Sequence, residues 1–288
     1  MIEFFDALRS EQIIQYAVLA GVMASIACGV VGSYVVVRRI TYLAGGVAHC
    51  TLGGMGAAQY FRVVYGIDAL RPLHGALAAA LFAALVIGWV SLRAKEREDT
   101  VISALWAIGM AVGVLFIART PGNNEDLMSY LFGNILLVSR ADLYVIGALD
   151  LLVVGLAILF YNKFLAVCFD QEFARLRGVS VEFYFLLLLC LTALTVVVLV
   201  TVVGLVMVIA LLTLPVAIAG HFVGRLWQVM IVAALISIGL TTGGQAVSFG
   251  PDLPPGAMTI VLAGGLYLAT LVVGRVRHSK RSRTARAP

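Results

Sequence analysis

The stretch RRITYLAGGVAHCTLGGMGAAQYF, residues 38–61, decides the fold of this chain. As a helix it carries two adjacent ridges of small residues at four-residue spacing, interrupted by one histidine: Gly45, His49, Gly53 and Ala57, then Gly46, Cys50, Gly54 and Ala58. Small residues at this spacing let helix backbones approach closely inside a membrane. We therefore expect a helix deep in a bundle, with His49 turned inward.

The composition agrees with a membrane protein. The chain has 288 residues, of which 62% are hydrophobic and 12% charged, and its apolar runs have about the twenty residues that a helix needs to cross a bilayer. A soluble protein would carry about twice this share of charge, and a transmembrane barrel would show alternating segments of about ten residues. The first residues, MIEFFDALRSEQ, are acidic instead of forming a basic leader, so we expect the first span to remain in the mature protein. The fold class is all-α and polytopic.

The apolar runs predict about nine transmembrane helices, at residues 13–37, 41–61, 75–92, 100–118, 141–160, 181–200, 202–219, 226–247 and 257–274. The sixth and seventh form one run that is too long for a single crossing, so a tight turn is expected near Thr201 and Gly204. The connection at 119–140 is either a plain loop or a short re-entrant helix, and 248–256 should be a rigid turn. The chain thus divides into a transmembrane domain, 1–274, and a basic tail, 275–288, expected to be disordered.

Lysine and arginine positions indicate the orientation in the membrane. With the N-terminus outside, 15 of the 20 basic residues face the cytoplasm, including the C-terminal tail. Cytoplasmic connections carry such an excess, and attraction to anionic lipid headgroups accounts for the charge of the tail. No nucleic-acid partner is needed to explain the net charge of +5.

Several chemistries lack their motifs. The four cysteines, Cys28, Cys50, Cys168 and Cys190, have no CxxC spacing, so neither disulfides nor a structural zinc site is expected. No phosphate-binding loop, HExxH or GxSxG is present, so neither ATP hydrolysis by this chain nor an intramembrane enzyme is indicated, and no permanently bound cofactor is expected.

Three polar residues within the apolar spans are candidates for a translocation pathway: His49, Asp150 and Gln245. Intramembrane ionisable groups are costly and usually functional. Each also has a plain structural interpretation, since His49 can be a hydrogen-bonded packing residue, Asp150 a neutral packing contact, and Gln245 a side chain bonded to backbone. For Asp150 we favour the packing role.

The segment FDQEFARLRGV, residues 169–179, lies between two apolar spans on the cytoplasmic side. Asp170 can cap a short helix, Glu172 adds favourable charge at its start, and Gly178 can end it. Such an amphipathic helix lies either on lipid or against a partner.

The stretch GVVGSYVVVRRITYLAGGVAH, residues 29–49, resembles the membrane permeases of ABC importers for zinc, manganese and iron. The matching residues are Gly29, Gly32, Ser33, Arg38, Arg39, Tyr42 and His49. LFGNILLVS at 131–139, the segment 169–179, LLTLPVAIA at 211–219 and PDLPPGA at 251–257 are also similar, in the same order.

This resemblance implies a type II importer permease bundle, a homodimer with the pathway on its twofold axis, and a divalent transition metal as substrate. It also implies a separate ATP-binding subunit docked on a coupling loop that includes Asp170, Glu172, Ala174 and Gly178, an extracytoplasmic metal-binding protein, and the bacterial or archaeal cell membrane, the inner one where there are two. The family usually has an aspartate one turn before the histidine, where this chain has Gly45. The alternative is a secondary transporter driven by an ion gradient, with Asp150 as its coupling carboxylate.

Overall fold

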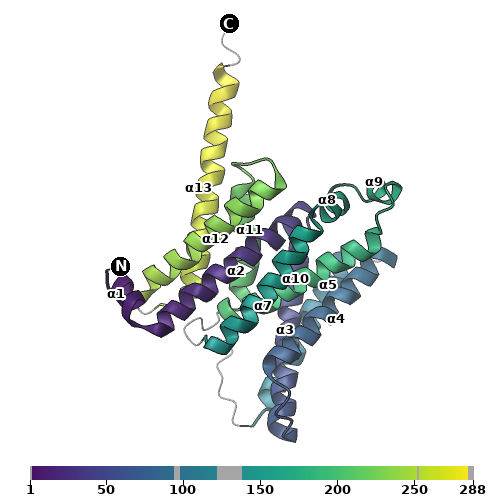
Figure 1. The fold of residues 1–288 in the computed structure, drawn as a ribbon, viewed down its shortest axis with the longest axis vertical. Helices are drawn as coiled ribbons and strands as arrows, with labels where there is room; N and C mark the ends of the chain where they lie inside the picture. Colours follow the sequence, from purple (N-terminus) through teal and green to yellow (C-terminus); the bar gives the residue numbers. More distant parts are fainter. Residues whose placement is uncertain (1, 94–97, 122–137, 252, 285–288) are drawn as a thin grey trace.

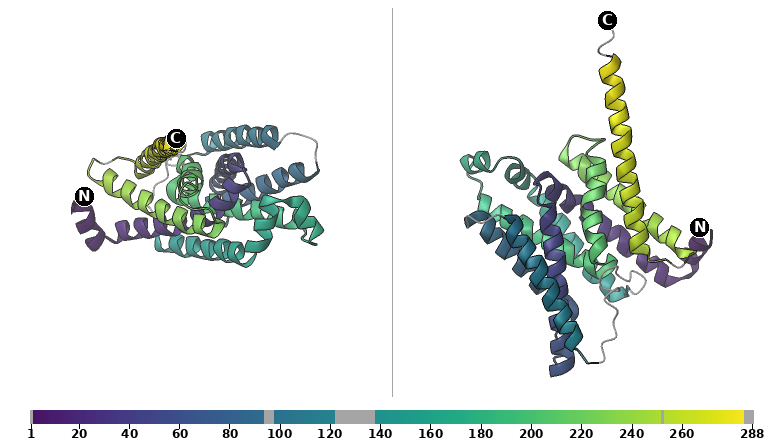
Figure 2. Two further views of the ribbon diagram at one scale, coloured as in Figure 1. Left: turned by 90° about the horizontal axis from the view of Figure 1, so that it is seen from above. Right: turned by 180° about the vertical axis from the view of Figure 1, so that it is seen from behind.

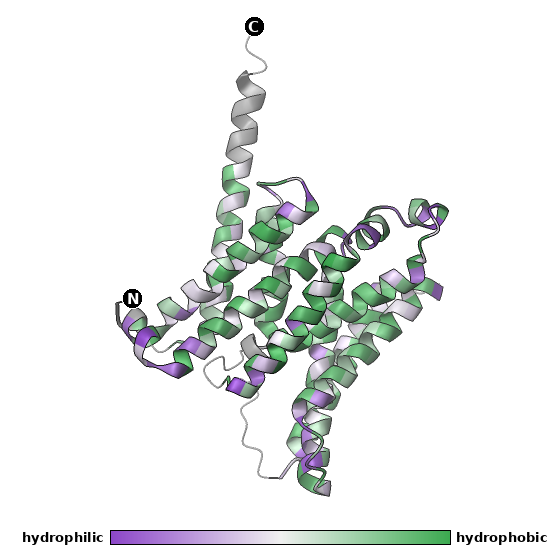
Figure 3. Ribbon diagram, in the orientation of Figure 1, coloured by the Kyte–Doolittle hydropathy of each residue, from purple (hydrophilic) through white to green (hydrophobic). Residues whose placement is uncertain are grey.

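The computed structural model describes residues 2–93, 98–121, 138–251 and 253–284, and these residues are almost entirely helical (Figure 1). The described helices are α1 Ile2–Ser10, α2 Gln12–Val37, α3 Thr41–Tyr65, α4 Pro72–Arg93, α5 Glu98–Arg119, α7 Arg140–Leu159, α8 Tyr161–Phe169, α9 Gln171–Leu176, α10 Val181–Val203, α11 Leu205–Ala219, α12 Leu226–Phe249 and α13 Pro255–Thr284. Nine of these coincide with the nine expected spans. Figure 3 shows apolar residues along the helices and polar ones gathered near their ends.

Seven of the described helices are long and apolar enough to cross a membrane: α2, α4, α5, α7, α10, α12 and the part of α13 up to Gly274. The other two expected spans are α11, which is apolar but has only 15 residues, and α3, which its glycines and polar residues make less apolar. Burial inside the bundle compensates for the lower hydropathy of α3, because the residues from Leu43 to Gly53 are all shielded by neighbouring helices.

The expected break in the longest apolar run lies at Gly204. This residue separates α10 from α11 and has a φ of 81°, a backbone conformation that residues with a Cβ reach only at a cost. Its amide donates to the carbonyl of Val200 at 3.2 Å and closes the last turn of α10. One glycine thus divides the run.

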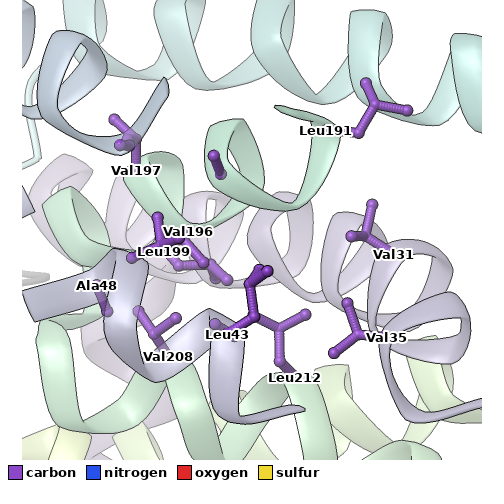
Figure 4. Packing of buried hydrophobic residues seen from close by; sticks show 14 of the residues in the cluster. Val31, Val35, Leu43, Ala48, Leu191, Val196, Val197, Leu199, Val208 and Leu212 are labelled. Carbon is purple, nitrogen blue, oxygen red and sulfur yellow. The ribbon is translucent and has the colours of Figure 1, made fainter. Parts of the chain in front are cut away.

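Helix α3 lies within the bundle, as its small ridges predicted. It packs mainly against α4 and α5 and also touches α10 and α11. A Cβ on Gly54 would collide with the carbonyl oxygen of Gly75 on α4, and one on Gly53 would lie 2.7 Å from the carbonyl oxygen of Gly109 on α5. Figure 4 shows apolar side chains of α2, α3, α10 and α11 that belong to the hydrophobic core. The glycines therefore permit backbone contact on two sides.

The helix ends fall on two sides of the molecule. In Figure 1, α8, α9, the connection from α11 to α12 and the end of α13 lie at the top, while the connection from α3 to α4 and the start of α7 lie at the bottom. This agrees with the expected alternation of the spans. The turn expected at 248–256 falls where α12 ends, at Phe249, and α13 begins, at Pro255, with residue 252 outside the described part.

One expectation about local structure was wrong, one helix was not predicted, and one expectation cannot be judged. The tail was expected to be disordered from residue 275, but α13 continues to Thr284, because Lys and Arg favour helices and neither glycine nor proline interrupts 275–284. Helix α8 was not predicted, because it falls between an expected span and the segment 169–179. Most of the 119–140 connection, including residues 131–137 of the similar segment, lies outside the described residues.

Candidate functional site

His49 is stacked against an indole ring. Its side chain is 8% exposed, and its ring lies 4.2 Å from the ring of Trp106 on α5, with 17° between the two planes. Among the described residues, the buried Nδ1 of His49 has no hydrogen-bond partner. Buried polar atoms are nearly always paired, so each exception needs an explanation. His49 therefore lacks the hydrogen bond at Nδ1 that a simple packing histidine would make.

Gly45 faces the same indole ring, one helical turn before His49. A Cβ at this position would lie 3.2 Å from Cζ3 of Trp106 and 3.3 Å from Cδ1 of Ile209 on α11. Trp106 and Ile209 therefore border the space that a side chain at position 45 would enter. The described part of the chain brings no three His, Cys, Asp or Glu side chains together in a group that could hold a metal ion.

The aromatic environment of His49 extends along α3 and α5. The ring of Tyr42 lies 5.7 Å from that of Trp106, and its hydroxyl is 3.2 Å from the hydroxyl of Ser103. Cys50, the residue after His49, also contacts α5, where its thiol donates to the carbonyl of Leu105 at 3.2 Å. Trp106 was missed by the sequence analysis, since nothing in the pattern of α5 indicates which helix its ring contacts.

Asp150 and Gln245 lie elsewhere in the bundle. Asp150 is buried on α7, which packs on α2, and its Oδ1 lacks a hydrogen-bond partner within the described residues. The Gln245 amide on α12 donates to the carbonyl of Ala17 on α2 at 3.4 Å. The structure therefore brings both residues to α2, whereas His49 lies where α3 meets α5. The three candidates do not form one cluster.

The segment 169–179 forms the short helix α9 with caps at both ends. Oδ1 of Asp170 accepts a hydrogen bond from the amide of Phe173 at 2.9 Å. At the other end Gly178 has a φ of 73°, its amide donates to Arg175, and the amide of Val179 donates to Ala174 at 3.0 Å. This pair of bonds is the Schellman motif. The expected caps of Asp170 and Gly178 are thus both present.

Helix α9 exposes apolar side chains on its surface. Ala174 is fully buried and anchors the helix to the bundle, and Glu172 lies exposed in its first turn. Leu176 is 88% exposed and Phe169, just before the helix, 68%. A groove of about 590 Å³ lies beside them and is lined by α8, α9 and the start of α12, including Phe173, Arg225 and Trp227. Four exposed apolar side chains lie in this region, Phe169, Phe173, Leu176 and Trp227. We call them the α9 surface.

Comparison with known proteins decides what kind of bundle this is. The model of the family described as "ABC 3 transport family" matches residues 10–274. The chain belongs to the ABC 3 transport family. This permease is therefore the membrane component of an ABC transport system, a multi-pass helical protein that works with other subunits and leaves ATP hydrolysis to one of them. The family match also decides against the secondary transporter.

Relatives of the permease agree in length and fold. A Chlamydia trachomatis serovar D protein named "probable metal transport system membrane protein" is 41% identical over 90% of this chain and 88% of its own length. The "manganese transport system membrane protein MntC" of Halalkalibacterium halodurans is 32% identical over 92% of this chain and 88% of its own. A chain in the solved structure of PsaBC from Streptococcus pneumoniae in complex with Fab is 25% identical, with a TM-score of 0.82 over 94% of this chain and 95% of that one.

Proposed function

We propose that the permease forms a homodimer that takes up a divalent transition metal, zinc, manganese or iron, through the cell membrane of a bacterium or archaeon. A separate cytoplasmic subunit hydrolyses ATP, and an extracytoplasmic binding protein delivers the metal. The names of the relatives, which refer to metal and manganese transport, support the substrate class. The metal is cargo, and the permease holds no permanent cofactor.

The α9 surface is the observation that carries this proposal. Phe173 and Leu176 on α9, and Phe169 at the end of α8, are all exposed. A helix of six residues such as α9 is too short to be stable without packing against something else. Large exposed apolar patches mark interaction sites. A docked ATP-binding subunit would cover these side chains and move α9 as a unit, because both ends of the helix are capped. In this arrangement α9 and the C-terminus face the cytoplasm.

The bundle has a second uncovered face that fits a homodimer. Helices α5 and α13 lie along the same edge of the molecule when it is seen from above (Figure 2). Both expose large apolar residues, among them Ile108 and Leu115 on α5 and Val261 on α13. A second copy on this edge would place the two α5 helices, and behind them the two His49 side chains, around a twofold axis. This arrangement supports His49 as a pathway residue.

Replacing Gly178 with valine tests the docking role of α9. No described atom lies within 4 Å of a Cβ at this position, so the cost comes from the left-handed backbone alone and is about 1–2 kcal/mol. We expect Gly178→Val to distort the end of α9 and lower both copurification of the ATP-binding subunit and metal-stimulated ATP hydrolysis.

Gly66 provides the matched control. It lies in the connection between α3 and α4, on the opposite side of the molecule, and it also has a positive φ, 67°, with no described atom within 4 Å of a Cβ. Gly66→Val imposes the same backbone strain away from α9 and should leave copurification and hydrolysis at the wild-type level. Equal behaviour of the two variants would place the joint with the ATP-binding subunit elsewhere.

A further inference from the structure

We infer that the groove between α2 and α7 binds one phospholipid with an anionic headgroup, and that Arg140 holds the phosphate of that lipid. The groove has a volume of about 570 Å³, which is within the range of sites for a single small molecule, about 300–1,000 Å³. The site does not depend on the proposed transport. Its assignment to the outer leaflet rests on the orientation that we propose for the chain.

The groove follows two membrane-crossing helices from their extracytoplasmic ends. Helices α2 and α7 are both long and apolar enough to span a bilayer, and they pack against each other. The apolar lining of the groove includes Leu19, Met23, Leu143 and Leu151. From Arg140 to Leu151 the groove extends about 16 Å at 1.5 Å per residue, which is about half of the 30 Å hydrocarbon core. Its length therefore matches the depth of one leaflet.

Gly147 gives the groove its depth. This residue lines the groove on α7, and a Cβ at its position would lie 2.9 Å from Cε of Met23 on α2. A larger side chain would occupy the space between the two helices. Glycine at position 147 thus leaves room for an acyl chain beside Met23.

Arg140 stands at the mouth of the groove as an oriented cation. Its Nε donates to the hydroxyl of Tyr16, its Nη2 donates to Oε1 of Gln12 at 3.3 Å, and its guanidinium carbon lies 5.6 Å from the ring centre of Tyr16. Both partners are uncharged, so they orient the guanidinium without neutralising it. A guanidinium has five N–H donors, of which these bonds use two, and its planar fork suits a phosphate.

The charge of Arg140 needs a partner that the orientation of the chain does not supply. Asp142 is close in sequence, but its carboxylate accepts hydrogen bonds from the amide and the hydroxyl of Ser139, at 3.0 and 2.6 Å, in the capping box of α7. Basic residues are concentrated in cytoplasmic connections, whereas Arg140 lies at the extracytoplasmic end of its helix. An anionic headgroup attracts a basic residue near the membrane surface by about 1 kcal/mol, and this attraction accounts for the position of Arg140.

The groove stays open in the proposed homodimer. When the molecule is seen from above, α7 lies along the opposite edge from α5 and α13, the edge given to the second copy (Figure 2). Tyr144, one turn after Arg140, lines the groove and is 80% exposed. Tyrosine is enriched at the level of the headgroups. The surroundings of the groove are therefore lipid, with the headgroup region beside Arg140.

Native mass spectrometry tests the headgroup contact. The permease is released from detergent micelles that contain phosphatidylglycerol or phosphatidylcholine with the same acyl chains, and the lipids that it retains are counted. We expect the wild-type protein to retain one phosphatidylglycerol in preference to phosphatidylcholine. Arg140→Gln should lower this preference about fivefold, the factor that corresponds to about 1 kcal/mol.

Arg71 provides the matched control for charge. It is exposed in the connection between α3 and α4, on the same side of the membrane, and Arg71→Gln should leave the preference unchanged. An unchanged preference in Arg140→Gln, or an equal loss in both variants, would overturn the site. Weaker docking of the extracytoplasmic binding protein by Arg140→Gln, with an unchanged lipid preference, would assign Arg140 to that protein and also overturn the site.

Two glycines of α7 test the groove itself. Gly147→Leu fills the groove and should lower the retention of both lipids. Gly155→Leu adds the same side chain to the same helix where no described atom lies within 4 Å of a Cβ, and it should retain lipid like the wild-type protein. Wild-type retention in Gly147→Leu would show that the lipid does not lie in the groove.

A measurement on the wild-type protein keeps the test decisive if a variant does not fold. Phosphatidylglycerol with a photoreactive diazirine on its acyl chain is cross-linked to the permease in nanodiscs, and the labelled peptides are identified by mass spectrometry. We expect labels concentrated at residues 16–23 and 140–151. Labels spread evenly over other helices, such as α4, would contradict the inference. These readouts require neither ATP hydrolysis nor uptake, so the lipid site and the proposed function can fail separately.

Discussion

Replacing His49 should not unfold the protein, because the favourable and unfavourable contacts of its side chain nearly cancel in free energy. The stack on Trp106 stabilises the folded protein by about 0.5–1.5 kcal/mol, whereas the unpartnered buried Nδ1 costs about 1–3 kcal/mol. We therefore expect His49→Ala to change the free energy of unfolding little and to lower metal uptake strongly. Uptake of radioactive metal and the yield of monodisperse protein measure the two effects.

His221 is the control for this change. It lies exposed after α11, and its Nδ1 is 2.8 Å from the carbonyl of Ala217, so His221→Ala should preserve uptake. Normal uptake in His49→Ala over a wide range of metal concentrations would show that His49 is not on the pathway.

Asp150 supplies a second prediction at this scale. An ionised carboxylate at bilayer depth costs several kcal/mol, and Oδ1 has no partner in the described part of the chain. Asparagine has nearly the same shape and no charge, so Asp150→Asn should retain uptake and keep or raise thermal stability. Asp150→Ala, which leaves a cavity between α7 and α2, should lower the stability. Loss of uptake in a well-folded Asp150→Asn protein would instead assign this carboxyl to transport.

At the scale of the helices, the close backbone contact between α3 and α4 can be tested. A Cβ on Gly54 would collide with the backbone of Gly75 on α4, and overpacking of this kind costs about 1–3 kcal/mol. Gly54→Ala should lower the unfolding temperature in detergent. Gly155→Ala on α7, where no described atom lies within 4 Å of the added methyl, should be neutral or slightly stabilising. Equal unfolding temperatures would mean that α3 and α4 are less closely packed than described.

Local chemistry made some elements predictable and left others hidden. The caps of α9 follow from Asp170 and Gly178, and the break at Gly204 follows from a glycine within a run that is too long, because both depend on neighbouring residues. The contact of Trp106 with His49 and Gly45 depends on how two helices pack, which no spacing within one helix records. Helix α8 was missed because its apolar residues, such as Phe164, pack on the bundle without continuing a span.

At the scale of the whole molecule, the nine helices that coincide with the expected spans could be predicted, because bilayer thickness sets the length of a membrane-crossing helix. The order in which the helices pack could not, so the sequence placed His49, Asp150 and Gln245 on one candidate pathway although they lie at different helix contacts. The family shows that the permease works with other subunits. The specific partners that we propose rest on two uncovered apolar faces, the α9 surface and the edge formed by α5 and α13.

Metal uptake by reconstituted vesicles tests the central claim most directly. The permease is inserted with its ATP-binding subunit, the binding protein is supplied outside, and uptake of Mn²⁺ or Zn²⁺ is followed with ATP inside. We predict uptake that requires all three proteins and stops when the ATP-binding subunit carries a substitution that prevents hydrolysis. Equal uptake by the permease alone under a proton gradient, without ATP, would contradict the account and identify a secondary transporter.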